Sequence, residues 1–294
     1  MPSGEEAEAG GGGPRLLQPG EAGETVVMAS YPRSGNTMLR KLIEASTGVL
    51  TGSDSRADIA MNRDLKLYGL AGEGDTGDHN GGGRVWVVKS HFPVSRGRKE
   101  LGAQRAILLV RNPFNAIRSY FNMLLTGTHT HSIMPSEYAR FATAWDQHVR
   151  GEVRLWCEYH RWWLRQPIPV LVVRYEELVA TRPAAREREL CRVTDFLYGP
   201  THTRRRERAG GGAGGATAGP RVEDTPRDEI VARLRATLDQ AAKGDTAVDT
   251  AYKPRSACVA TDVSHYTEEH QAFVASTTAP LLDQLGYSDL LQGK

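Results

Sequence analysis

The sequence predicts an α/β fold, a parallel β-sheet flanked by helices on both faces. Two observations lead to this prediction. Short segments that are apolar throughout alternate along the chain with amphipathic segments of helical period, as in parallel sheets whose strands are buried on both sides. Polar side chains also follow directly after each apolar segment, at the strand ends where such sheets bind their ligands.

Four strands are expected, each a short apolar run. They cover residues 25–29, 84–88, 106–110 and 170–173. Because amphipathic segments separate these runs, helices can connect successive strands, and a parallel arrangement follows.

The first helix is predicted to follow the polar loop that begins after residue 30. Met38, Leu39, Leu42 and Ile43 fall on one helical face, and Gly48 stands where the helix should end.

The second helix is predicted to begin at Asn112, a capping residue that is followed by Pro113 at the first helical position. Ile117, Phe121 and Leu124 continue it with amphipathic spacing. Further helices, one or two of them in the first segment, are expected within 135–165, 189–197, 226–241 and 267–285.

Length and composition bound the domain organisation and the class of function. The 294 residues are predicted to hold a disordered tail, 1–23, and a single domain, 24–294, with a low-complexity insertion at about 199–220. A net charge of +2 argues against nucleic-acid binding, and three cysteines exclude a disulfide-stapled scaffold. No apolar run reaches membrane-spanning length. We therefore expect a cytoplasmic protein, or one of the Golgi lumen if a targeting segment lies outside this sequence.

Positively charged groups are concentrated at the predicted strand ends. Arg33 follows the first strand, Lys89 the second, Arg111 the third, and Arg174 with Tyr175 the fourth. Because the carboxyl ends of parallel strands meet at one edge of the sheet, these side chains predict an anion-binding site there.

The loop Arg33-Ser34-Gly35-Asn36-Thr37 has the composition of a short phosphate-binding turn. Gly35 lets the backbone approach a ligand, and the N–H groups that follow it, with the Ser34 and Thr37 hydroxyls, supply donors. The nucleotide-binding pattern G-x-x-x-x-G-K-[ST] is not matched, because its first glycine and its lysine are missing. A well-capped helix that binds no ligand is the alternative at this point.

Two further strand ends carry groups that suit group transfer. Lys89 and His91 alternate along an extended segment, so we expect them to project to the same side, a cation beside a base that titrates near neutrality. Arg111 and Ser119, eight residues apart, are placed to offer a guanidinium fork and a hydroxyl to one phosphate. For each of these groups the alternative is a solvated surface residue.

Together these segments resemble the sulfotransferases that use 3′-phosphoadenosine 5′-phosphosulfate (PAPS). Residues 31–37, Tyr-Pro-Arg-Ser-Gly-Asn-Thr, are similar to the family's 5′-phosphosulfate loop. Residues 89–93, Lys-Ser-His-Phe-Pro, resemble the segment that holds the catalytic histidine, and residues 111–120 resemble the 3′-phosphate motif. Residues 173–178, Val-Arg-Tyr-Glu-Glu-Leu, are similar to the strand end whose tyrosine contacts the adenine. The resemblance covers residues 25–198.

The resemblance implies a three-layer sandwich of the P-loop-nucleotide-hydrolase-like type. It also implies an enzyme that moves a sulfonate group from PAPS to a hydroxyl or amine by in-line attack. Residues 33–37 would bind the 5′-phosphosulfate, Arg111 and Ser119 the 3′-phosphate, and Tyr175 the adenine. His91 would be the base.

The resemblance also suggests which residues stabilise charge, whether a metal is needed and where the acceptor binds. Lys89 and Arg33 would balance the negative charge that builds up on the sulfonate. No metal is predicted, since the sequence shows no acidic pair at a strand end to hold one. The acceptor is a small molecule, a glycan or a peptide, and acceptor loops are expected in segments such as 49–83 and 124–137, whose composition names no substrate.

The sequence departs from the family pattern at three places. Arg33 occupies the position where most members carry lysine, and arginine keeps the charge but does not donate a proton to the departing phosphate. Met38 stands where many members have a tryptophan stacked on the adenine. The family's C-terminal Arg-Lys-Gly contact to the 3′-phosphate has no clear match, with Lys253 and Arg255 as candidates. The loop residues Arg-Ser-Gly-Asn-Thr are similar to those in the sulfotransferase domains of WSC-domain proteins. The cysteine-rich WSC module itself is not found in this sequence.

Two other functions stay open. A kinase-like P-loop phosphotransferase would need a strand-end carboxylate for magnesium and a lysine in the phosphate loop. A non-catalytic PAPS-binding protein would need neither His91 nor Lys89, and both are present.

Overall fold

The computed structural model shows a five-stranded parallel sheet in the order β2-β3-β1-β4-β5. It describes residues 14–18, 24–55, 84–94, 100–128, 131–180, 182–198, 230–233, 235–236 and 261–287. The strands are β1 (Val26–Ser30), β2 (Gly52–Ser53), β3 (Val87–Ser90), β4 (Arg105–Val110) and β5 (Val170–Arg174). The predicted α/β fold is therefore confirmed.

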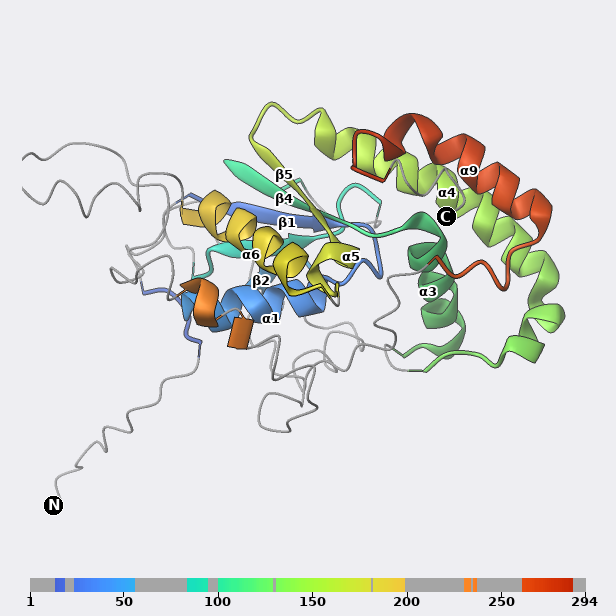
Figure 1. Cartoon of the computed structure of the whole chain (residues 1–294), viewed down its shortest axis with the longest axis horizontal. Helices are drawn as coiled ribbons and strands as arrows, with labels where there is room; N and C mark the ends of the chain where they lie inside the picture. Colours follow the sequence, from blue (N-terminus) through green and yellow to red (C-terminus); the bar gives the residue numbers. More distant parts are fainter. Residues whose placement is uncertain are drawn as a thin grey trace, which may run out of the picture.

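Helices cover both faces of the sheet (Figure 1). They are α1 (Asn36–Thr47), α3 (Pro113–Thr126), the 3₁₀ helix η1 (Pro135–Phe141), α4 (Ala142–Leu164), α5 (Tyr175–Leu178), α6 (Pro183–Tyr198) and α9 (Glu268–Leu282). α1 and α6 pack on one face, and α3, α4 and α9 pack on the other. The result is the expected three-layer sandwich.

All four predicted strands are present, with small shifts at their ends. The sequence pattern does not predict β2, because its two residues, Gly52 and Ser53, contain no apolar run. β2 pairs with β3 at the edge of the sheet, where Ser53 lies beside Lys89.

The helix boundaries follow the expected capping chemistry. Gly48 ends α1 in the left-handed conformation, with φ of 68°, and its N–H donates to the carbonyl oxygen of Glu44. The Asn112 side chain accepts a hydrogen bond from the N–H of Phe114 (3.0 Å), and α3 begins at Pro113. α6 begins earlier than its predicted bounds. In the predicted helix at 226–241, residues 230–233 and 235–236 are described and are helical.

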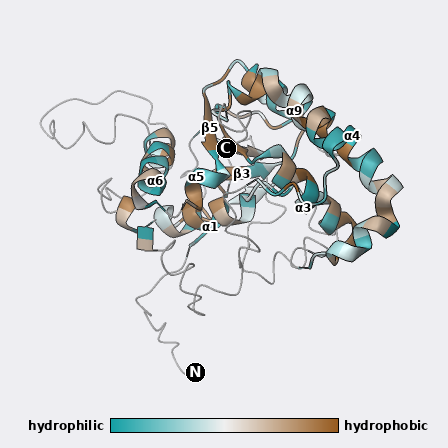
Figure 2. Cartoon of the chain, turned by 45° about the vertical axis from the view of Figure 1, so that its right-hand side comes forward, coloured by the Kyte–Doolittle hydropathy of each residue, from teal (hydrophilic) through white to brown (hydrophobic). Residues whose placement is uncertain are grey.

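Side-chain alternation divides each strand between two hydrophobic cores. Val27 and Ala29 of β1 belong to the core under α3, α4 and α9, whereas Val26 and Met28 belong to the core under α1 and α6. Figure 2 shows β5 in the hydrophobic colour, while α4, α6 and α9 carry both colours, as expected for helices with one face on a sheet.

β1 occupies the topological switch point of the sheet. From β1 the chain runs to β2 and β3 on one side and then crosses to β4 and β5 on the other. Loops that follow the strands diverge at such a point and leave a crevice at the carboxyl ends. The polar loop after β1 lies at this position.

Part of the N-terminal tail is packed against the domain. In the predicted disordered segment 1–23, Arg15 exchanges backbone hydrogen bonds with Gly48 (3.0 Å) and Leu50 (2.8 Å), and Leu17 is buried in the core beside α1. Residues 1–13 and 19–23 and the insertion at 199–220 lie outside the described residues. Within the described ranges, no helix is both long and apolar enough to cross a bilayer.

Candidate active site

The polar groups predicted at the strand ends lie along one edge of the sheet. Parallel pairing places Ala29 of β1 between Ser90 of β3 and Leu108 of β4, and it places Val110 of β4 beside Arg174 of β5. The residues that follow these positions therefore meet at the carboxyl edge, with the loop after β1 at the centre.

The loop between β1 and α1 passes twice through the left-handed region of backbone conformation. Gly35 has a φ of 96°, and Arg33 has a φ of 68° although it carries a side chain. Residues other than glycine rarely adopt this conformation, and those that do are concentrated at functional sites. The motif predicts the special role of Gly35, but nothing in it predicts the conformation of Arg33.

Gly35 also leaves room for the ring of Tyr175. A Cβ atom at residue 35 would lie 2.4 Å from Cδ2 of that ring, much closer than real contacts allow. The structure thus brings the turn at Gly35 into contact with the residue that follows β5, and two residues assigned to the nucleotide from sequence are neighbours.

Gly35→Ala is expected to lower the free energy of unfolding by about 2–5 kcal/mol, because the new methyl group must displace the Tyr175 ring and must adopt left-handed backbone. Urea denaturation measures this loss. Gly48→Ala is the matched control, since Gly48 also has a positive φ of 68° but has nothing within 4 Å of the added Cβ. Equal losses in the two variants would show that the contact with Tyr175 does not matter.

Arg33, Arg111 and Ser119 form a connected group beside this contact. Nε of Arg33 donates to Oγ of Ser119 (3.1 Å), and Nη1 of Arg111 donates to the carbonyl oxygen of Arg33 (2.9 Å). The Arg111 guanidinium lies over the ring of Tyr175, with Cζ 4.7 Å from the ring centroid. Four residues that the sequence assigns to the nucleotide are therefore joined by direct contacts.

Several donors at this loop have no partner within the described part of the protein. Ser34 Oγ and Arg111 Nε are buried and make no hydrogen bond there. α1 starts from Gly35 without a side-chain cap or an acidic first turn, whereas Asn112 and Thr267 cap α3 and α9. Because buried donors are nearly always paired and uncapped helix N-termini attract anions, this arrangement fits bound phosphate groups.

His91 is held in one tautomer by the backbone of β1. Its Nδ1 atom lies 2.5 Å from the carbonyl oxygen of Ser30. A carbonyl oxygen only accepts, so Nδ1 carries the proton and Nε2 of the neutral ring keeps a lone pair. Nε2 lies 3.4 Å from Nδ2 of Asn36, which also donates to Oγ of Ser30 (3.2 Å). The Nε2 atom of His91 therefore faces the loop between β1 and α1.

Lys89 and His91 have hydrogen-bond partners on opposite sides of β3. Lys89 is buried and donates through Nζ to Oγ of Ser55, just after β2 (3.1 Å), whereas His91 contacts Ser30 of β1 and Asn36 of α1. Next to Ser55, Asp54 accepts a hydrogen bond from Oγ of Ser90 (2.6 Å). Asp54 and Ser55 are thus additions to the site that no motif in the sequence marks.

Carboxylates stand at strand ends, which corrects the sequence-based view that no acidic pair does so. Asp54 follows β2, and Glu176 and Glu177 follow β5. Each is engaged by the protein: Asp54 as just described, Glu176 by the N–H of Asn112 (2.9 Å) and Glu177 by an ion pair with Arg174. In the described ranges none follows β3 or β4, the neighbours of β1, and no three histidine, cysteine or acidic side chains gather as a metal site.

Comparison with known families agrees with this geometry. The family model of the sulfotransferase domain matches residues 24–205, more than half of the chain. The chain belongs to the sulfotransferase domain family. The resemblance predicted from the sequence is thereby confirmed.

Two curated relatives of this sulfotransferase domain are insect proteins. The chain is 35% identical to WSCD family member CG9164 of Drosophila melanogaster over 175 residues, which is 59% of this chain and 50% of that protein. It is 34% identical to WSCD family member AAEL009094 of Aedes aegypti over 158 residues, which is 53% of this chain and 46% of that protein. The matched region therefore spans about half the length of these relatives.

In this sulfotransferase domain, α4 supports the site from one face of the sheet. The hydroxyl of Tyr31 donates to the carboxylate of Glu152, and the hydroxyl of Tyr159 donates to the carbonyl oxygen of Ser90 (3.4 Å). Burial raises the pKa of Tyr31 and of Glu152. Sequence reasoning does not find these supports, because each partner pair is widely separated along the chain.

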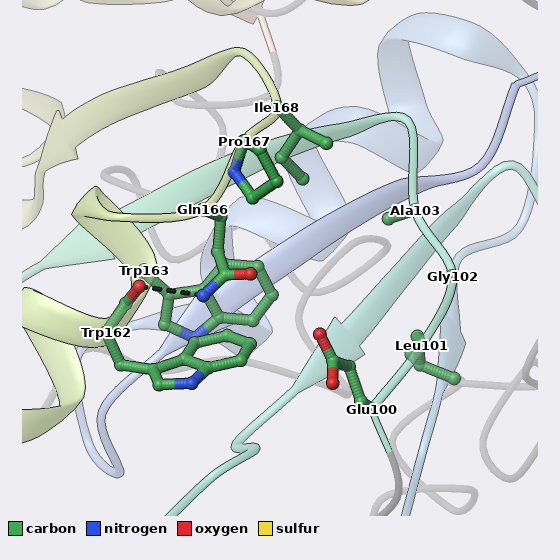
Figure 3. A pocket seen from close by; sticks show the side chains of 9 residues that line it. All are labelled: Glu100, Leu101, Gly102, Ala103, Trp162, Trp163, Gln166, Pro167 and Ile168. Atoms are coloured by element: carbon green, nitrogen blue, oxygen red, sulfur yellow. Dashed lines mark hydrogen bonds between the residues drawn. The ribbon is translucent and has the colours of Figure 1, made fainter.

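The structure also contains a cavity of about 390 Å³ (Figure 3). Its lining comes from the segments that lead into β4 and β5 and from the end of α4, namely Glu100, Leu101, Gly102, Ala103, Trp162, Trp163, Gln166, Pro167 and Ile168. None of the sequence-predicted site residues lines it. Its lining segments lead into the amino-terminal ends of β4 and β5, whereas the candidate site is at the carboxyl edge.

Proposed function

We propose that this domain moves a sulfonate group from PAPS to a hydroxyl or amine acceptor, with His91 as the base. The observation that carries the proposal is the position of His91. Its Nδ1 atom lies against the Ser30 carbonyl oxygen and its Nε2 atom faces Asn36, in a loop where the buried Ser34 hydroxyl makes no hydrogen bond within the described residues. A base and an anion-binding loop at neighbouring strand ends are what such a transfer requires.

The 5′-phosphosulfate is proposed to bind at residues 33–37. The first turn of α1 has no side-chain cap, and the buried Ser34 hydroxyl makes no hydrogen bond within the described residues, so both are placed to donate to a ligand. Thr37 adds a hydroxyl one residue beyond Asn36, whose Oδ1 atom it contacts at 3.3 Å. Arg33 supplies positive charge at the same turn.

The 3′-phosphate is proposed to bind at Arg111 and Ser119. Arg111 is anchored by the carbonyl oxygen of Arg33 and by the ring of Tyr175, which leaves its Nε atom for a ligand. Ser119 lies at the same place, since its hydroxyl contacts Arg33. Tyr175 presents an aromatic ring beside Gly35, and we assign it to the adenine.

PAPS, when bound, would supply an activated sulfonate: as an acceptor oxygen or nitrogen attacked the sulfur, the bond from sulfur to the bridging oxygen of the 5′-phosphate would break and 3′,5′-bisphosphoadenosine would leave. In our proposal Nε2 of His91 takes the proton from that acceptor atom. The ring then carries a positive charge, which the Ser30 carbonyl oxygen stabilises through the Nδ1–H bond. Arg33 and Lys89 balance the negative charge that develops around the sulfonate.

The charges at the strand ends favour sulfonate transfer over the kinase-like alternative. The strands beside β1 are followed by His91 and Arg111, and the carboxylates of Asp54, Glu176 and Glu177 are bonded to protein donors. A kinase-like enzyme would need a carboxylate near the phosphate loop to hold magnesium.

The test is a transfer assay with PAPS labelled in the sulfonate group. Acceptors should include phenols, steroids, amines, glycans and tyrosyl peptides, each assayed with EDTA and with magnesium, and His91→Ala serves as the inactive control. We expect transfer to at least one class of acceptor at similar rates under the two conditions.

Two results would overturn the proposal. Activity that EDTA abolishes, magnesium restores and ATP supports would identify a kinase-like phosphotransferase. Tight binding of PAPS without transfer to any class of acceptor would identify a non-catalytic PAPS-binding protein.

A further inference from the structure

Glu176 connects three parts of the chain at the proposed 3′-phosphate site. It is buried, and its Oε1 atom accepts from the N–H of Asn112 (2.9 Å) while its Oε2 atom accepts from the hydroxyl of Tyr287 (2.5 Å). The Tyr287 hydroxyl also lies 3.3 Å from the carbonyl oxygen of Val110. A residue at the end of β5 is therefore bonded both to the turn after β4 and to the C-terminal segment.

The burial of this group makes its two hydrogen bonds important. Tyr287 is 3% exposed and Glu176 is 9% exposed. Burial raises the pKa of the Glu176 carboxyl, and the bonds from Tyr287 and Asn112 act against that rise. A buried carboxylate that loses one of its donors is destabilised where it stands, and we expect the surrounding backbone to shift in response.

The C-terminal segment also holds the first turns of α3. The Nδ2 atom of Asn112 donates to Oγ1 of Thr261 (2.7 Å), and the N–H of Asp262 donates to Oδ1 of Asn115 (3.0 Å). Asp262 further pairs with Arg118 at 2.5 Å. The turn that carries Arg111 is thus held on one side by residues 261–262 and on the other by Tyr287 through Glu176.

The contacts of Glu176 fix both the turn that carries Arg111 and the Tyr175 ring that packs on the Arg111 guanidinium. Arg111 directly precedes Asn112, and the ring of Tyr175 on which it lies directly precedes Glu176. The bonds from Glu176 therefore set the distance between the arginine backbone and its aromatic support. None of these C-terminal residues falls within the range matched by the sulfotransferase model, residues 24–205.

We propose that the C-terminal segment, residues 261–287, acts as a clamp that positions Arg111 for a 3′-phosphate, with Tyr287 and Glu176 as positioning residues. The inference rests on the proposed function, because it takes the ligand at Arg111 to be the 3′-phosphate of an adenosine bisphosphate. The clamp acts through Arg111 and does not itself touch the ligand.

The variant Tyr287→Phe tests the clamp by removing one hydroxyl. We expect its affinity for 3′,5′-bisphosphoadenosine to fall about tenfold or more, the range for losing a hydrogen bond to a charged group. Its affinity for adenosine 5′-monophosphate, which has no 3′-phosphate, should change less than about threefold, within the scatter of contacts that are not part of the clamp. Isothermal titration calorimetry with the two nucleotides on the full chain measures the ratio.

Tyr138→Phe is the matched control. Tyr138 is also buried and shares a hydrogen bond with α3, where its hydroxyl accepts from Nδ2 of Asn122 (2.9 Å), at the end of the helix far from Arg111. We expect this variant to lose stability without a change in the ratio of the two affinities. A merely structural role for Tyr287 would give the same result in both variants and would overturn the clamp.

The wild-type chain supplies a second measurement that needs no variant. Addition of 3′,5′-bisphosphoadenosine should slow amide hydrogen exchange in residues 261–266 and 283–287 more than adenosine 5′-monophosphate does at equal saturation. Equal protection by the two nucleotides would overturn the clamp alone. A wild type that binds no 3′,5′-bisphosphoadenosine would overturn the proposed function and the clamp together.

Discussion

His91→Ala is expected to lower kcat by about 10²- to 10⁴-fold, the usual contribution of a general base. Affinity for PAPS should stay nearly unchanged, because the proposed partner of Nε2 is the acceptor and not the nucleotide. The measurement is steady-state sulfonate transfer on an identified acceptor, together with calorimetric titration of the nucleotide.

The pH dependence separates catalysis from structure in this variant. A protonated imidazole cannot accept a proton, so the wild-type rate should fall on the acid side, and the acid limb should be missing in His91→Ala. If His91 had only a structural role, His91→Ala would instead lower the free energy of unfolding, because the bond from Nδ1 to the Ser30 carbonyl oxygen would be lost. Near-wild-type turnover by the folded variant would remove His91 from the mechanism.

Arg111→Ala is expected to weaken binding of 3′,5′-bisphosphoadenosine by about 10- to 100-fold, since a hydrogen bond to a charged group contributes about 1.5–3 kcal/mol. Adenosine 5′-monophosphate should lose less affinity. Some loss is expected for it too, because Arg111 also holds the carbonyl oxygen of Arg33 and covers the ring of Tyr175. Calorimetry with both nucleotides gives the two values.

Arg150→Ala is the control for loss of an arginine. Arg150 is partly exposed and pairs with Asp146 (2.9 Å) and Glu269 (2.6 Å) on the side where α4 meets α9. We expect that change to leave both affinities intact. If Arg111→Ala weakened the two nucleotides equally, Arg111 would not bind the 3′-phosphate.

Much of the fold followed from local patterns. Apolar runs marked four of the five strands, and capping chemistry placed the start of α3 and the end of α1, because these signals lie within a few residues of one another. β2 was not predicted, because two small residues at a sheet edge form no apolar run. Its position depends on pairing with β3, which is a tertiary event.

The candidate site also has a part that the sequence predicts and a part that it does not. The motif around Gly35 and the residues after β3 and β4 could be named from sequence, because parallel strands bring their carboxyl ends to one edge. The hydrogen-bond partners of these residues could not be named from the sequence. Lys89 bonds to Ser55, and His91 takes its tautomer from Ser30, and each of these pairs is far apart along the chain.

By itself, then, the sequence determined the α/β class, the edge of the sheet where the candidate site lies and the types of side chain that stand there. The physical reason is that hydrophobic period and strand-end chemistry are local properties. Only the tertiary structure decided which nitrogen of His91 faces the Ser30 carbonyl oxygen, how Arg33 turns through left-handed backbone, and how Tyr287 reaches Glu176. Those features depend on the relative placement of strands and helices, which is set when the two cores pack against the sheet.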